Sequence, residues 1–421
     1  MILYYWLIWI TPIEHHPIWT RTIAGITIIK YLGLGCLIYA AHYLGAAKRN
    51  PHYFQTMQSI WFAIFFAIAV ISYSTKGPHF STESNPFITY LSFFILFFVT
   101  ITLIDSFGKL RWVLLSAVGS IGYAALYLLR EWQHDPSSRP GWVLNPNDFG
   151  AGVALCFPVA LSLLLEKRPR IERLYCLGCM LAMLAGLAVA ASRGGFFGLI
   201  AGLLVVMWYS RKRLRKMMPL AALFLGLTLL TIASPLGQRL FDPSRSDVGS
   251  AEIRQTLWTF ALELIKKHPV VGIGLGMFKP TLAALTHGQF AYVAHNTYLE
   301  IAAEMGVPAL FCYLMILFGS LRTLAKVRRS VSRTGPAILQ QVVPGLQAGL
   351  LGCSVTLVFS SLADFKLFWL ILFLTMCMPC LVSRFQQKRA QQGGKQPEGV
   401  SPELQREEIL VLGETESWRH G

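Results

Sequence analysis

The feature that most constrains this chain is a series of apolar stretches, each about as long as a helix that crosses a membrane. Such a helix needs roughly 17–25 apolar residues, and eleven stretches reach or approach that length. Their approximate cores are residues 23–45, 58–74, 86–104, 112–129, 147–166, 174–192, 196–209, 217–234, 297–320, 343–361 and 367–383. Residues 1–10 are as apolar but short, so they are either a twelfth span or an interfacial segment.

The composition agrees with a membrane protein. The 421 residues are 54% hydrophobic and 14% charged, whereas soluble domains are roughly 45–50% apolar and about 25% charged. This excludes an ordinary soluble enzyme, a disordered chain and a disulfide scaffold. Cys176/Cys179 and Cys377/Cys380 have the spacing of some metal sites, but they lie in apolar runs without His or acidic partners. We therefore interpret them as packing residues. The predicted fold is an all-α integral membrane bundle of 11–12 spans.

The distribution of Lys and Arg predicts how the spans are oriented. Basic residues in short loops stay on the cytoplasmic side. Starting with residues 46–57, every second connection is rich in them, and the tail from residue 384 continues the alternation. The C-terminus is therefore expected in the cytoplasm. The net charge of +16 is explained by loops held at an anionic membrane surface rather than by nucleic acid.

One connection on the outer side is much longer than the others. It covers residues 235–296 and includes a predicted amphipathic helix over residues 251–267. One face of that helix carries Ile253, Leu257, Phe260, Ala261 and Leu264. The chain is therefore expected to divide into an N-terminal transmembrane bundle (1–234), an ordered outer loop subdomain (235–296), C-terminal transmembrane helices (297–383) and a disordered cytoplasmic tail (384–421).

Two arginines stand out on the outer side. Ser192-Arg193-Gly194-Gly195 joins two spans at their outer ends. A guanidinium at membrane depth usually faces a partner or a polar cavity, and the glycines allow close backbone approach. The alternative is an arginine that extends to the membrane surface from a tight turn. Arg254, followed by Trp258, lies on the predicted loop helix, where an ordinary solvated arginine is the alternative.

Three further groups of residues border the outer spans. Gly272-Ile273-Gly274-Leu275-Gly276 lacks the GxGxxG spacing of a dinucleotide site, so we expect a turn packed on the preceding helix. Asn145-Pro146-Asn147-Asp148 opens the 147–166 span, where helix capping is the simplest interpretation. The third group is Ala294-His295-Asn296-Thr297-Tyr298-Leu299-Glu300, with Glu304 one turn further on.

His295 is the candidate catalytic residue of that third group, because an imidazole transfers protons well near neutral pH. Glu300 and Glu304 are four residues apart, so they share a helix face. Acidic residues near a span are costly unless they are paired or hydrated. We expect them either to bind Arg or Lys groups and fix the loop, or to support the site.

These motifs, taken in order, resemble the O-antigen ligase family of bacterial surface polysaccharide enzymes. The resemblance covers residues 145–320 through NPNDFG, SRGG, R-x-x-x-W followed by HPVVGIGLGMF, and AHNTYLEIAAEMGVPALF. It implies a GT-C-like glycosyltransferase of the bacterial inner membrane. Such ligases move a glycan from undecaprenyl diphosphate to a hydroxyl of lipid A–core on the periplasmic face, without metal, ATP or cofactor.

The resemblance also implies residue roles. Arg193 and Arg254 correspond to the arginines that hold the donor diphosphate, and His295 to the catalytic histidine. Asn147, Asn296, Glu300 and Glu304 are supporting candidates. Alternatives in the same superfamily are an O-antigen or exopolysaccharide polymerase and a protein O-oligosaccharyltransferase. A transporter is a different class, but its usual internal repeats and broken midplane helices are not evident in the sequence.

Overall fold

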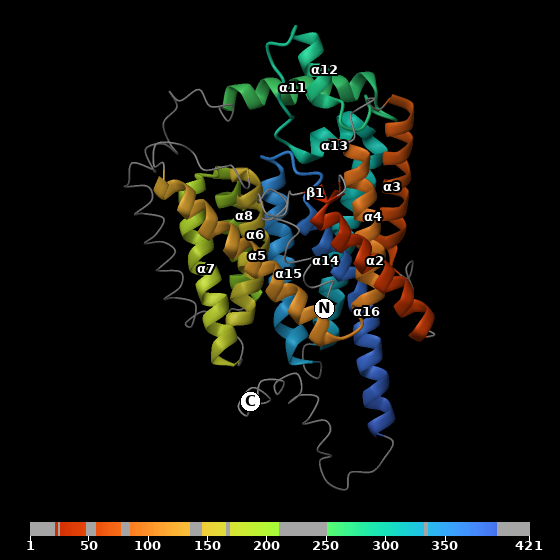
Figure 1. Ribbon diagram of the computed structural model, residues 1–421, viewed down its shortest axis with the longest axis vertical. Helices are drawn as coiled ribbons and strands as arrows, with labels where there is room; N and C mark the ends of the chain where they lie inside the picture. Colours follow the sequence, from red (N-terminus) through yellow and green to blue (C-terminus); the bar gives the residue numbers. More distant parts are fainter. Residues whose placement is uncertain are drawn as a thin grey trace.

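The protein is a bundle of long helices with a smaller helical segment at one end (Figure 1). The computed structural model describes residues 22–23, 26–47, 56–76, 85–134, 145–165, 169–209, 251–331 and 336–393. Eight of the described helices are long and apolar enough to cross a membrane, and two shorter apolar helices accompany them. The prediction of an all-helical, multi-pass membrane protein is therefore confirmed, apart from one small strand pair.

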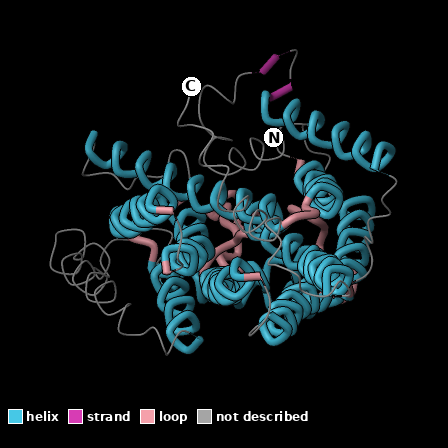
Figure 2. Tube along the Cα trace, turned by 90° about the horizontal axis from the view of Figure 1, so that it is seen from below, coloured by secondary structure: helices cyan, strands magenta, loops and turns pink. Residues whose placement is uncertain are grey.

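The first part of the chain contains that strand pair and seven described helices. Strands β1 (Thr22–Ile23) and β2 (Ile26–Thr27) are antiparallel, with Thr22 opposite Thr27. Viewed along the bundle, they lie at its edge beside the helix that follows them (Figure 2). The helices are α2 (Ile28–Ala47), α3 (Met57–Lys76), α4 (Pro86–Leu103), α5 (Phe107–His134), α6 (Pro146–Leu164), α7 (Arg170–Ala190) and α8 (Arg193–Tyr209).

The second part of the chain contains six described helices. They are α11 (Ala251–Lys267), α12 (Phe278–Leu285), α13 (Thr297–Met305), α14 (Val307–Val331), α15 (Ala337–Leu357) and α16 (Lys366–Gly393). α11 and α12 lie across one end of the bundle, which we call the α11 end (Figure 1). The predicted span at 217–234, residues 1–10, residues 235–250 of the long connection and most of the predicted tail lie outside the described residues.

Two boundaries differ from those predicted. The predicted span at 297–320 is two helices, because α13 ends at Met305 and the next residue, Gly306, has a φ of 86° that breaks the helix. The Val307 N–H then donates to the Pro269 carbonyl at 2.8 Å, so the break is fixed by the preceding loop. The second difference concerns α16, which continues to Gly393, so the start of the tail predicted from residue 384 is helical.

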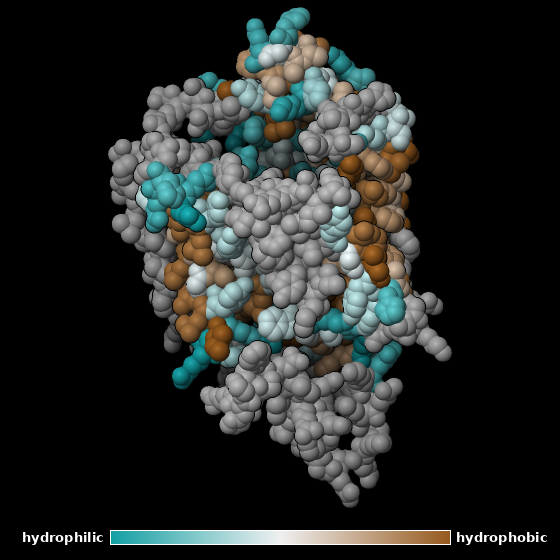
Figure 3. All heavy atoms as spheres, in the orientation of Figure 1, coloured by the Kyte–Doolittle hydropathy of each residue, from teal (hydrophilic) through white to brown (hydrophobic). Residues whose placement is uncertain are grey.

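Side chains on the outside of the bundle are those expected against lipid. Large apolar residues are exposed on the outer faces of several helices, including Ile38, Leu126, Leu204 and Phe318. On the face shown in Figure 3, hydrophobic residues gather along the flanks of the bundle, and hydrophilic ones gather toward its two ends. Exposed apolar surface of this extent indicates contact with a membrane.

One half of the bundle packs around aromatic rings. Trp369 of α16 is buried at its centre, and its indole N–H donates to the Ala363 carbonyl at 2.9 Å. The rings that surround it come from α3, α4, α14 and α16, and are those of Phe62, Phe65, Phe93, Tyr313 and Phe373. Such tilted and edge-on ring pairs add specific geometry to apolar burial.

The other half packs through glycines on α6, α8 and α15. A Cβ placed on Gly150 would lie 2.9 Å from the Gly195 Cα, and one on Gly198 would lie 2.5 Å from the Gly352 carbonyl oxygen. Both distances are too short for any side chain, so the three backbones are in direct contact. Small residues allow this close packing of membrane helices. The packing holds the start of α8 in a fixed position at the α11 end.

Candidate active site

Arg193 is placed by a sharp turn between α7 and α8. Ala191 adopts the left-handed conformation with a φ of 50°, and Ser192 immediately precedes α8. The Ser192 Oγ accepts from the Gly195 N–H at 3.2 Å, and its carbonyl accepts from the Phe196 N–H at 3.0 Å. Arg193 is therefore the first residue of α8, and its side chain is exposed at the α11 end while the two glycines after it are buried.

Asn147 lies beside this turn. Its Oδ1 accepts a hydrogen bond from the Ser192 hydroxyl at 3.3 Å, which ties the start of α6 to the start of α8. The cap of α6 is Asn145, whose side chain accepts from the Asn147 N–H at 3.0 Å. The sequence motif therefore caps the helix, as expected. It also places Asn147 in contact with Ser192, the residue directly before Arg193.

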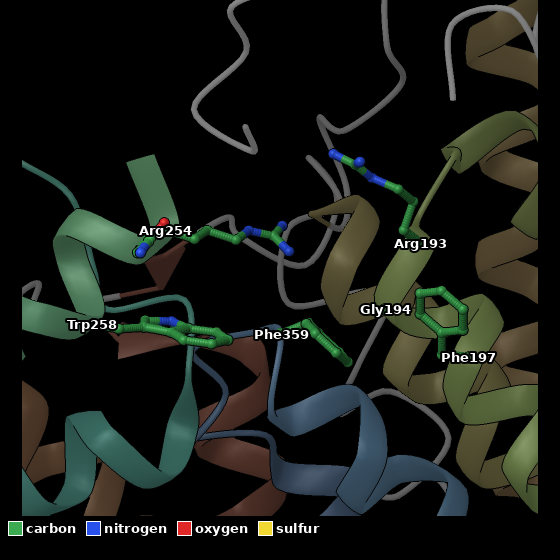
Figure 4. A pocket seen from close by; sticks show the side chains of 7 residues that line it. Arg193, Gly194, Phe197, Arg254, Trp258 and Phe359 are labelled. Atoms are coloured by element: carbon green, nitrogen blue, oxygen red, sulfur yellow. The ribbon is translucent and has the colours of Figure 1, made fainter. Parts of the chain in front are cut away.

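The two predicted arginines line the same pocket. The pocket has a volume of about 380 Å³ and lies between the start of α8, α11 and the segment after α15. Its lining residues are Arg193, Gly194, Phe197, Arg254, Gln255, Trp258 and Phe359. Figure 4 shows both guanidinium groups extending into the space between α8 and α11. Residues separated by sixty positions in the chain thus supply two positive charges to one small volume.

Three aromatic side chains, those of Phe197, Trp258 and Phe359, also line the pocket. Trp258 comes from α11 and lies beneath Arg254, whereas Phe359 lies between the two helices (Figure 4). The ring centroids of Phe359 and Phe197 are 6.1 Å apart. The sequence singled out Trp258 through its proximity to Arg254, but gave no signal for Phe197, Gln255 or Phe359. The two phenylalanines belong to apolar runs in which any aromatic residue looks like ordinary packing.

His295 lies outside the lining of this pocket but near Arg254. It has a φ of 50°, an unusual conformation for a residue other than glycine. Burial lowers the pKa of His295 below its ordinary value, and the positive charge of Arg254 lowers that pKa further. The neutral imidazole, which can accept a proton, is therefore the favoured form near neutral pH.

Asn296 and Glu300 fix the backbone on either side of His295. The Asn296 side chain caps α13 by accepting from the N–H groups of Tyr298 at 3.0 Å and Leu299 at 3.1 Å. Glu300 Oε2 accepts from the Ala294 N–H at 3.2 Å and also from the Ser361 hydroxyl. Burial raises the pKa of Glu300, and these two hydrogen bonds oppose the increase.

Glu304 holds the glycine turn. Its two carboxylate oxygens accept from the Gly276 N–H at 2.9 Å and the Phe278 N–H at 3.0 Å. The turn also bonds to the backbone of α13, because the Gly274 N–H donates to the Glu304 carbonyl at 2.9 Å. Gly272, Gly274 and Gly276 all have positive φ, which favours glycine. Burial and the charge of Glu300 raise the pKa of Glu304.

One of the two expectations for this region needs correction. The glutamates fix the loop, but their carboxylates bind backbone N–H groups and Ser361 rather than the expected Arg or Lys groups. The glycine turn packs as expected on the preceding helix, because Ile273 lies against the cluster that includes Ala261 and Leu264 of α11. The turn also bonds to the backbone of α13. A carboxylate has two acceptor oxygens and can bind two N–H groups of a glycine turn at once. An Arg or Lys side chain has no acceptor and cannot bind them.

A comparison with protein families matches the segment that contains all three principal candidates. Residues 178–314 match the O-antigen ligase family. The match begins in α7, ends in α14 and includes Arg193, Arg254 and His295, so it confirms the resemblance over that segment. A comparison of the chain with curated proteins found no match.

The segment that matches this family therefore provides cations, aromatic rings and an imidazole at one end of the bundle. Within the ranges that the structure describes, no group of three or more His, Cys, Asp or Glu side chains is arranged to hold a metal ion. The guanidinium groups suit a phosphate ligand, because their planar forks bind phosphate oxygens in pairs and keep their charge. The imidazole suits proton transfer from a hydroxyl.

Proposed function

We propose that this protein is an O-antigen ligase. It transfers a glycan from undecaprenyl diphosphate to a sugar hydroxyl of lipid A–core, as a step of lipopolysaccharide biosynthesis. The observation that carries the proposal is the shared pocket of Arg193 and Arg254, beside His295, inside the segment that matches the family. The reaction uses no metal, ATP or other cofactor.

The arginines act on the leaving group. When the glycosidic bond breaks, its electron pair stays with the diphosphate, which gains negative charge. Two guanidinium groups aimed at that charge stabilise the transition state more than the ground state. Electrostatic stabilisation of this kind is worth roughly 3–4 kcal/mol per group. The diphosphate is already a good leaving group, so cations can replace a general acid.

His295 acts on the acceptor. The acceptor oxygen attacks the anomeric carbon, and its proton passes to the neutral imidazole. The lowered pKa of His295 keeps that neutral form available near pH 7. General base catalysis of this type typically contributes about 10²–10⁴-fold. A single displacement opposite the departing diphosphate inverts the configuration of the anomeric centre.

The charge distribution supports a periplasmic site in the bacterial inner membrane. α14 begins at the α11 end and has Arg328 and Arg329 in its last turn, at the opposite end. Basic residues favour the cytoplasmic side, so the pocket faces the periplasm and the C-terminus faces the cytoplasm. The helical bundle with a long periplasmic loop is of the GT-C-like type.

A reconstituted transfer assay tests this proposal. The full-length protein is given an undecaprenyl-diphosphate-linked glycan as donor, with lipid A–core as acceptor. We expect glycan on lipid A–core with the wild type, no loss on addition of EDTA, and no transfer with His295→Ala. The His295→Ala protein should still insert into membranes and bind donor.

The same assay distinguishes the related activities. Longer lipid-linked chains in place of glycosylated lipid A–core would identify a polymerase. Transfer to Ser or Thr of an added periplasmic protein would identify an O-oligosaccharyltransferase. Normal transfer by His295→Ala would remove the histidine from the mechanism whichever acceptor is used.

A further inference from the structure

Thr297 connects the turn that contains His295 to the α15–α16 loop, residues 358–365. Its side chain is fully buried and makes two hydrogen bonds to that loop. The hydroxyl donates to the Ser360 carbonyl at 2.6 Å and accepts from the Leu362 N–H at 2.9 Å. A buried hydroxyl with both roles filled is costly to replace, because each lost bond leaves a backbone group without a partner.

A second connection joins the same two segments. Glu300 accepts from the Ala294 N–H, which precedes His295, and from the Ser361 hydroxyl of the α15–α16 loop. Hydrogen bonds from both sides of His295 therefore converge on residues 360–362. A left-handed conformation at a residue other than glycine persists only where its surroundings determine it. His295 has a φ of 50°, and the hydrogen bonds on its two sides are the surroundings that hold it in this conformation.

The other end of the α15–α16 loop reaches the arginine pocket. Phe359 lines the pocket, and its Cβ would lie 3.0 Å from a Cβ placed on Gly194. The Phe359 N–H donates to the Thr356 carbonyl at 2.9 Å, and the Thr356 hydroxyl donates to the Gly194 carbonyl at 3.2 Å. The loop is therefore fixed to α8 next to Arg193 and fixed to α13 next to His295.

We infer that Thr297 is a positioning residue for His295, and that the α15–α16 loop sets the distance between this imidazole and the arginine pocket. The inference depends on the proposed function, because it assigns the reacting base to His295. Catalysis by a base depends steeply on its distance from the reacting atoms, and a shift of about 1 Å can cost around 10²-fold. Binding of the donor diphosphate by Arg193 and Arg254 does not need Thr297.

A pair of substitutions at Thr297 tests this inference in the full-length protein. Thr297→Val keeps the shape of the side chain and removes both hydrogen bonds, whereas Thr297→Ser keeps both. We expect Thr297→Val to lower kcat for glycan transfer by about 10–100-fold, with KM for the lipid-linked donor unchanged within about twofold. Thr297→Ser should restore most of kcat.

Thr375→Val is the matched control. Thr375 is equally buried, on α16, and its hydroxyl donates to the Leu372 carbonyl at 2.6 Å. It should leave kcat unchanged. Wild-type kcat in Thr297→Val would overturn the inference. Weaker donor binding together with a lower unfolding temperature in Thr297→Val would also overturn it. So would a decrease in kcat in Thr297→Ser as large as that in Thr297→Val, because each result indicates a merely structural role.

The failure of the proposed function would look different. If His295→Ala transferred glycan normally in this assay, His295 would not be the base, and any effect of Thr297→Val would have another origin. If His295→Ala is inactive and Thr297→Val is fully active, the proposed function stands and the positioning role of Thr297 is wrong.

Discussion

The protonation state of His295 links its position to its chemistry. An imidazole serves as a base only when it is neutral, and both burial and the charge of Arg254 favour that form. Arg254 therefore has two effects in the proposed mechanism. It binds the donor, and it holds the pKa of the nearby base below the ordinary value of about 6.5.

This second effect predicts a change in the pH profile. In the wild type, kcat/KM for transfer should fall on the acidic side with a midpoint below about 6.5. In Arg254→Gln the loss of a positive charge makes protonated His295 less unfavourable, so the midpoint should move to higher pH. Arg254→Lys, which keeps the charge, is the control. An unchanged midpoint in Arg254→Gln would show that this charge does not act on the titrating group.

The geometry of Arg193 predicts a difference between cations. Its fork can bind two phosphate oxygens at once, and an ammonium group cannot reproduce that contact. Arg193→Gln should lower kcat by roughly 10²–10³-fold, and Arg193→Lys should recover only part of that loss. Transfer rates and donor binding measured side by side provide the test. Full activity in Arg193→Lys would leave Arg193 with a point-charge role.

The sequence singles out three residues of the candidate site by their chemistry or position. Arg193 stands out because a guanidinium is costly at membrane depth, and His295 because an imidazole transfers protons well near neutral pH. Arg254 stands out through its helix and its neighbour Trp258. Phe359 could not be found in this way, because an aromatic residue within an apolar run is ordinary. Thr297 belongs to the motif around His295, but a threonine there has no distinguishing chemistry of its own. Their significance arises only when folding brings the α15–α16 loop against α8 and α13.

The packing of α8 against α6 depends on residues without side chains. A Cβ on Gly195 would meet the backbone of Gly150, which has no room to move within a helix. The SRGG motif therefore serves two purposes at adjacent positions. It presents a charge to the pocket through Arg193, and it brings α8 close enough to α6 and α15 to hold that charge in place.

Gly195→Ala should therefore destabilise the protein, by about 1–3 kcal/mol as for other overpacked sites. Thermal unfolding in detergent measures the effect, and donor affinity should fall with it because Arg193 moves with α8. Gly178→Ala is the matched control on α7, since a Cβ there meets nothing within 4 Å. The stability of the Gly178→Ala protein should be unchanged or slightly higher than that of the wild type. Equal destabilisation of both variants would argue against a specific α6–α8 contact.

Helix boundaries were predictable where composition determines them and not where tertiary contacts do. The spans up to α8 follow from apolar length, and the described helices fall on nearly the same residues. The separation of α13 from α14 was missed because the apolar pattern continues through Gly306. That break depends on the Pro269 carbonyl and the nearby Val270 backbone, which approach from the loop.

The candidate site depends on how two parts of the molecule are joined. Arg193 belongs to the bundle, whereas Arg254 and Trp258 belong to α11, across the end of the bundle (Figure 4). The pocket therefore keeps its shape only if α11 stays in a fixed position relative to α8. Glu304 helps to hold the segment after α11 against the bundle. Its carboxylate binds the glycine turn, its carbonyl accepts from the Ser72 hydroxyl of α3 at 2.9 Å, and the turn lies against Pro86 at the start of α4.

Glu304→Gln should loosen this connection without removing any residue of the pocket. The amide offers one acceptor oxygen in place of two, and its NH₂ group would face a backbone N–H that loses its partner, at a cost of about 1–3 kcal/mol. We expect faster hydrogen exchange in residues 272–278 and α11, with weaker donor binding. Glu263→Gln on the exposed face of α11 is the control. If Glu304→Gln lost activity while hydrogen exchange and donor binding stayed normal, Glu304 would act in the transfer reaction itself. It would then not be needed to hold α11 against the bundle.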